Sequence, residues 1–135
     1  MSPLISRRVL GVFAGLALAA ACNSTAPSAT LTPPQPTFPA NGARVISPQA
    51  TLMATHDGTS GSGDVTDRFE ISQSANFAQL VDVGDNIKLD SRGTSYTFRM
   101  PPATSDTVYY WRVRSSNSVT TSAFSSPVMF VYGVR

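Results

Sequence analysis

The sequence predicts an all-β protein, an antiparallel sandwich of two sheets that follows an N-terminal signal segment and a proline-rich tether. Two observations carry this prediction. Beyond residue 36, short stretches alternate apolar and polar side chains with the period of two that a half-buried strand shows. Turn signals rich in glycine, proline, asparagine and aspartate separate these stretches at roughly 8–15-residue spacing, and no amphipathic helical pattern lies between them.

Residues 1–21 have the organisation of a signal peptide. Arg7 and Arg8 precede an uncharged apolar run, residues 9–21. This run is too short to span a bilayer, which needs about 20 residues, and it has the size of a signal-peptide core. Because two of the ten basic residues lie in this segment, the remaining chain carries eight basic and eight acidic residues. A nucleic-acid partner is not expected, since it would require a basic stripe on the folded part.

Residues 18–22 read Leu-Ala-Ala-Ala-Cys and contain the only cysteine of the chain. They resemble the lipobox of bacterial lipoproteins, although the leucine stands one place earlier than that family prefers. The resemblance implies cleavage before Cys22, lipidation of its sulfur with fatty chains such as palmitate, and a membrane anchor in the bacterial cell envelope. Asn23 replaces the aspartate associated with inner-membrane retention, which favours the outer membrane in a Gram-negative organism.

An ordinary free cysteine is the alternative reading of Cys22. A free thiol is usually buried in a core, whereas this one lies between the apolar run and a proline-rich tract. Residues 22–36, rich in proline, serine and threonine, are expected to form a disordered tether. Proline fixes φ and removes a donor, so the tether should be extended, at about 3.1 Å per residue. The folded domain is then expected over residues 37–135.

Alternation predicts the strands of this domain in order. They are residues 43–46, 51–56, 67–74, 79–83, 87–90, 95–100, 107–115 and 128–133. A turn is expected at Gly84-Asp85-Asn86, between the fourth and fifth of these stretches. Trp111 is the only tryptophan, so its burial should dominate the core. The other side chains expected to face inward are Leu52, Ala54, Phe69, Ile71, Tyr96, Phe98, Met100, Tyr109, Val113, Val128, Phe130 and Tyr132.

Three motifs carry a family resemblance. Residues 107–117 alternate tyrosine and valine and run into a small residue and Asn, residues 122–127 read Ser-Ala-Phe-Ser-Ser-Pro, and residues 69–72 read Phe-Glu-Ile-Ser. They are similar to strand F, the approach to strand G, and strand C of the fibronectin type III branch of the immunoglobulin-like folds. The resemblance covers about residues 37–135 and implies an antiparallel two-sheet sandwich of that type.

The resemblance also implies roles for individual side chains. Tyr109 would be the tyrosine-corner residue, with its hydroxyl bonded to nearby backbone. Glu70 would lie beside Arg112 or Arg114 on the outer face of the sheet. Such an exposed cross-strand pair contributes only about 0.2–1 kcal/mol.

Residues for catalysis or metal binding are sparse. His56 is the only histidine, and the folded part contains no cysteine, so a structural zinc site lacks ligands. A Ser-His-Asp triad stays formally open because serines abound, but no Gly-x-Ser-x-Gly elbow frames one. Asp82, Asp85 and Asp90 lack the spacing of an EF-hand and are expected to form turns. We therefore expect no cofactor, no metal and no catalytic residue.

Tyr110, Arg112, Arg114 and Phe124 form the candidate binding surface. The two aromatic side chains are suited to stack on sugar rings or to contact a protein, although scattered surface apolar groups are the simpler interpretation. The sequence thus predicts a non-enzymatic, lipid-anchored envelope module for protein binding or spacing. A carbohydrate-binding accessory domain is the alternative, and a small hydrolase that uses His56 is a remote one.

Overall fold

The computed structural model describes residues 30–57 and 64–133. Throughout these residues the chain forms strands, turns and loops without a helix, and so without a helix that could cross a membrane. The strands are β1 (Gln35–Phe38), β2 (Ala43–Val45), β3 (Gln49–Thr55), β4 (Thr66–Ser72), β5 (Leu80–Lys88), β6 (Thr94–Arg99), β7 (Thr107–Ser116) and β8 (Val128–Tyr132).

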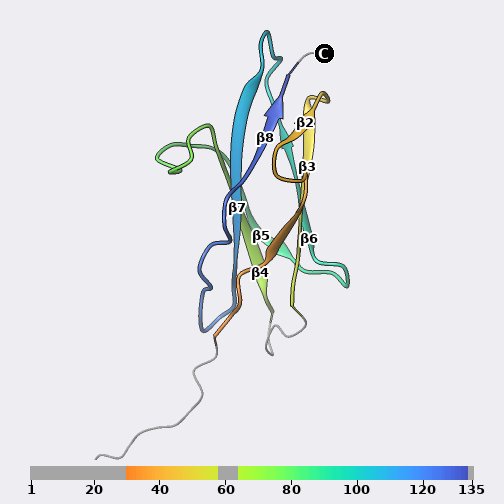
Figure 1. The fold of residues 1–135 in the computed structure, drawn as a ribbon. Coiled ribbons are helices and arrows are strands. Elements are labelled where there is room, and N and C mark those ends of the chain that lie inside the picture. The colour runs from red at the N-terminus through yellow and green to blue at the C-terminus, as the bar shows by residue number, and fades with distance from the viewer. Residues whose placement is uncertain (1–29, 58–63, 134–135) are drawn as a thin grey trace, which may run out of the picture.

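The strands form two sheets that pack face to face (Figure 1). One sheet has three strands in the order β1-β3-β6, and the other has five in the order β2-β8-β7-β4-β5. Neighbouring strands are antiparallel except β2 and β8, which are parallel. This arrangement confirms the predicted immunoglobulin-like sandwich of fibronectin type III form: two largely antiparallel sheets pack face to face, and strands distant in sequence, β1-β3-β6 and β8-β7-β4, are neighbours within them.

The core lies between the sheets and is centred on Trp111, as predicted. Trp111 and Phe69 are fully buried, and their rings stack with centroids 5.9 Å apart. The ring of Phe98, from the three-stranded sheet, meets Tyr109 edge-on at 5.1 Å. Aromatic contacts therefore join the two sheets, and each such pair adds about 0.5–1.5 kcal/mol beyond the burial of its area. The other predicted inward residues are buried or partly buried in the same cluster.

The turn predicted at residues 84–86 is wrong. These residues lie inside β5, which runs unbroken from Leu80 to Lys88 along β4. Gly84 is needed here for space, because a Cβ on it would lie 2.4 Å from the Cδ1 of Tyr96. Asn86 has a φ of 55°, and the β4–β5 register shifts next to it. The turn-like composition therefore marks a bulged strand under an aromatic ring.

Two further expectations concern the N-terminal boundary and Tyr109. β1 begins at Gln35, inside the stretch expected to be tether, and Pro34 before it is fully buried. Residues 1–29, including the signal segment and Cys22, lie outside the described residues. Tyr109 is buried as the resemblance implies, but between residues that the structure describes its hydroxyl makes no hydrogen bond to backbone.

Candidate functional site

The candidate binding surface lies on the outer face of the five-stranded sheet, which is the face turned away from the core. On β7, Tyr110, Arg112 and Arg114 alternate with buried residues and therefore point outward. The strand register places Glu70 of β4 opposite Arg112, and Arg68 opposite Arg114. Three of the four predicted surface residues thus follow one another along a single strand.

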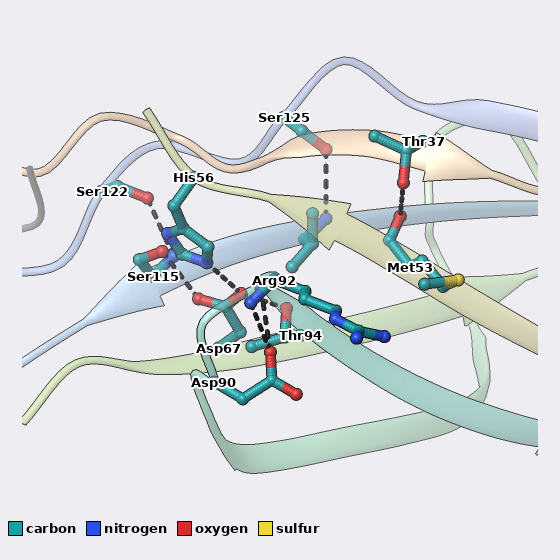
Figure 2. Close-up of polar contacts among 12 residues, drawn as sticks. Thr37, Met53, His56, Asp67, Asp90, Arg92, Thr94, Ser115, Ser122 and Ser125 are labelled. Carbon is teal, nitrogen blue, oxygen red and sulfur yellow. Dashed lines mark hydrogen bonds and ion pairs between the residues drawn. The ribbon is translucent and has the colours of Figure 1, made fainter. Parts of the chain in front are cut away.

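Phe124 reaches this face from the connection between β7 and β8. Ser122 and Ser125, on either side of it, pair the connection with the end of β7. The Oγ of Ser125 accepts a hydrogen bond from the N–H of Val113 at 3.1 Å, and the Oγ of Ser122 accepts one from the N–H of Ser115 at 3.0 Å (Figure 2). The backbone N–H groups of both connection serines return hydrogen bonds of 2.8 Å to the same two β7 residues.

Two arginines stack on aromatic rings. The Cζ of Arg112 lies 3.9 Å from the ring centroid of Phe124 and 4.2 Å from that of Phe77. The Cζ of Arg114 lies 4.6 Å from the centroid of Phe124. Each cation–π contact contributes about 0.5–1 kcal/mol at an exposed site. The structure therefore brings Arg112, Arg114 and Phe124 into direct contact and adds Phe77, which the sequence analysis missed.

Glu70 lies beneath the arginines of this face. Its Oε1 accepts hydrogen bonds from Nε and Nη2 of Arg112 at 3.0 and 2.8 Å, and its Oε2 accepts one from Nε of Arg68 at 2.9 Å. Burial raises the pKa of Glu70, but the hydrogen bonds and charges of the two arginines outweigh it and hold that pKa below its ordinary value. The expected partner Arg112 is confirmed. The expected exposure is wrong, because the Glu70 side chain is only 8% exposed.

A second polar cluster is buried between the sheets (Figure 2). The Oδ2 of Asp67 lies 2.8 Å from Nε2 of His56 and accepts a hydrogen bond from the Oγ1 of Thr94 at 2.6 Å. Its Oδ1 accepts one from the Oγ of Ser115 at 2.7 Å. His56 follows β3 and Thr94 begins β6, whereas Asp67 and Ser115 belong to β4 and β7. One carboxylate therefore ties the two sheets together.

This cluster is not arranged as a catalytic triad. In a triad the serine hydroxyl is hydrogen-bonded to the histidine, which takes its proton. Here the Ser115 hydroxyl donates to Asp67 instead, and Ser115 is buried. Among residues 30–57 and 64–133, His56 has Asp67 as its only side-chain partner. The arrangement stabilises the fold: His56, directly after the end of β3, donates a hydrogen bond to the buried Asp67 carboxylate.

The three aspartates expected in turns have separate partners. Asp82 accepts a hydrogen bond from the Tyr96 hydroxyl at 2.7 Å, and burial together with this carboxylate raises the pKa of Tyr96 to about 12. Asp85 pairs with Arg68 at 3.2 Å. Asp90 closes its own turn by accepting from two backbone N–H groups. In the described part of the chain, no three His, Cys, Asp or Glu side chains gather where they could hold a metal ion.

No protein-family model matches the chain, and no curated protein matches it. Among solved structures, the chain is similar to the crystal structure of an engineered protein, with a TM-score of 0.52 and 21% identity over 74% of this chain and 20% of that one. It is also similar to the sixth fibronectin type III domain of human fibronectin type III domain containing protein 3, with a TM-score of 0.47 and 25% identity over 84% and 92% of the two chains.

The FN1–FN3 domains of chicken CNTN1 give a TM-score of 0.48 and 14% identity over 77% of this chain and 34% of that one. This chain therefore spans only part of the engineered protein and of the CNTN1 segment. The fold assignment rests on the strand order, and the similarity to the engineered protein adds support for the fold alone. A fibronectin type III-like sandwich fits a non-catalytic module for binding or spacing, and many unrelated functions share such folds.

Proposed function

We propose that this protein is a non-catalytic, lipid-anchored module of the bacterial cell envelope that binds a partner protein or spaces it from the membrane. The observation that supports this most is the ordered outer face of the five-stranded sheet. Its arginines are held by Glu70 and by aromatic rings before any partner arrives. Side chains that are already fixed lose less entropy on binding, which favours recognition by this face.

Lipid anchoring through Cys22 is the second part of the proposal. Its support is the sequence before and after Cys22: an apolar run of signal-peptide size, a lipobox-like ending and a proline-rich tract. The described part of the chain begins and ends at opposite ends of the sandwich (Figure 1). A domain tethered through its N-terminal end would hold its C-terminal end away from the lipid. In a Gram-negative organism we place the anchor in the outer membrane.

The carbohydrate-binding alternative gains little support from the geometry. Stacking on a sugar needs an open aromatic face, and two guanidinium groups already lie over the Phe124 ring. Tyr110 is the remaining predicted aromatic residue on this face, and it is partly buried. The hydrolase alternative requires His56 to activate a nucleophile, whereas its side-chain partner among the described residues is the buried Asp67 carboxylate, which also accepts from Ser115.

Two experiments test the two parts separately. Metabolic labelling with a palmitate analogue should modify the wild type and not Cys22→Ser, and label in both would refute the anchor. For the binding face, Tyr110→Ala should lose a partner that the wild type captures from envelope extracts. Thr97→Ala, on the outward side of β6 in the other sheet, is the matched control and should retain that partner. Equal capture by both variants would refute the use of this face.

A further inference from the structure

We propose that one end of the outer face, formed by Arg68, Lys88 and Arg114, binds an extended acidic segment of the partner protein. The inference rests on the proposed function and names the chemistry of the partner. β4 begins and β7 ends here. The three side chains belong to the neighbouring strands β7 (Arg114), β4 (Arg68) and β5 (Lys88). The register places Lys88 opposite Thr66, two residues before Arg68 on the same side of β4.

Charge on this part of the face is unbalanced. Among the described outward-facing residues of β4, β5 and β7, the cations are Arg68, Lys88, Arg112 and Arg114, and the carboxylates are Glu70 and Asp85. The Glu70 carboxylate is 8% exposed, whereas the side chains of Arg68 and Arg112 above it are 28% and 27% exposed. Asp85, which pairs with Arg68, is 53% exposed, so four cations stand against one covered and one open carboxylate. The resulting excess of positive charge would attract an approaching carboxylate.

Arg114 is the central residue of this proposal. It lies directly opposite Arg68, and like charges at such positions are normally destabilising. Arg68 is turned to Glu70 and Asp85, but among the described residues Arg114 has no carboxylate within ion-pair distance. The ring of Phe124 holds it instead. A stacked guanidinium keeps its N–H edge free, and that edge matches a carboxylate in a bidentate arrangement.

Every aspartate and glutamate of the chain belongs to the described residues, since residues 1–29, 58–63 and 134–135 contain neither. Three carboxylates away from this face already have partners: Asp67 in the buried cluster, Asp82 on Tyr96, and Asp106 on the guanidinium of Arg44. No ion pair joins Arg114 to a carboxylate among the described residues, so we assign that pairing to a carboxylate of another molecule.

The remainder of the face indicates a protein segment rather than a purely anionic polymer. Tyr110 precedes Arg112 on β7, and the register places Met129 beside it and Val131 beside Val108. Val108 is exposed, and the other three are partly buried. An extended segment would place its acidic side chains on the Arg114 end of the face and its apolar side chains on the end formed by Tyr110 and Val108. A sulfated polysaccharide or an anionic membrane would leave the apolar end unused.

The test uses the mature chain and two synthetic fluorescein-labelled peptides. One has four glutamates followed by Tyr-Val-Leu, and the other has glutamine in place of each glutamate. Fluorescence anisotropy would be measured in about 20 mM and about 150 mM salt. The glutamate peptide should bind the wild type and bind Arg114→Gln about tenfold more weakly, because one charge-assisted pair is lost. Arg99→Gln, an exposed arginine on the outer side of β6, is the matched control and should bind like the wild type.

Several outcomes would overturn the inference. These are no binding of the glutamate peptide up to about 1 mM, equal binding of the glutamine peptide, or equal loss in Arg99→Gln. Tighter Arg114-dependent binding of dextran sulfate, or of vesicles containing phosphatidylglycerol, would replace the acidic segment with those anions. If Arg114→Gln captures the envelope partner normally while Tyr110→Ala does not, the acidic specificity fails and the proposed function stands.

Discussion

Replacing Asp67 should weaken the sandwich more than any other single polar change. In Asp67→Ala, the donors of His56, Thr94 and Ser115 lose their common acceptor. A buried donor left without a partner costs about 1–3 kcal/mol, and His56 at the rim recovers part of this by reaching water. The side chain of His56 is 12% exposed, so we count it at the low end. The expected loss is about 3–4 kcal/mol of the free energy of unfolding.

The assay is urea unfolding followed by the fluorescence of Trp111, the only tryptophan. Asp67→Asn keeps the shape and one acceptor oxygen, so it should cost about half as much as alanine. Ser115→Ala removes a single donor and should cost about 1 kcal/mol. This graded series still tests the argument if Asp67→Ala does not fold. A loss for Asp67→Asn no larger than that of Ser115→Ala would refute the role of the carboxylate as a shared acceptor.

Three other predictions follow from particular contacts. Trp111→Ala should cost about 3–5 kcal/mol in the same assay read by circular dichroism. Trp111→Phe should cost clearly less, because the buried Nε1 of Trp111 has no hydrogen-bond partner among the described residues. Gly84→Ala should lower the melting temperature, and by less in a Tyr96→Ala background, since its Cβ would meet the Tyr96 ring. The folded-state pKa of Glu70 is lowered, so its contribution is present above the ordinary glutamate pKa and is lost as pH falls through the folded value. The stability difference between wild type and Glu70→Gln should therefore shrink as pH falls from 7 to 3, and a constant difference would contradict this.

The residues of the buried polar cluster fall at inward positions of the same alternating pattern that predicted the apolar core. Asp67 has the same parity as Phe69 in β4, and Ser115 has the same parity as Trp111 in β7. His56 and Thr94 likewise continue the inward positions of their own strands. Extending each pattern by one step places four polar groups on inner faces, and buried polar groups need partners. Only apolar residues were assigned to the inner faces from the sequence, so the cluster was not predicted.

Other features could not be derived from the local sequence. Phe77 has a φ of 55°, a conformation that an aromatic residue rarely adopts, and its ring lies 4.2 Å from the Cζ of Arg112, a contact between residues far apart in sequence. The composition of residues 84–86 favours a turn, and the Tyr96 ring of the opposite sheet decides against it. Both outcomes depend on side chains distant in sequence, so periodicity and turn propensity cannot supply them.

The connection from Ser122 to Ser125 links the stability of the domain to its candidate binding face. Its serines complete the hydrogen bonding of β7 beside Ser115, which itself donates to the buried Asp67. Phe124, between those serines, projects to the outer face and holds Arg112 and Arg114. A change in the connection backbone would therefore disturb core and surface together. Replacement of a guanidinium at the end of an outward side chain leaves those backbone bonds intact, which makes Arg114→Gln a cleaner test of binding than any variant of the connection.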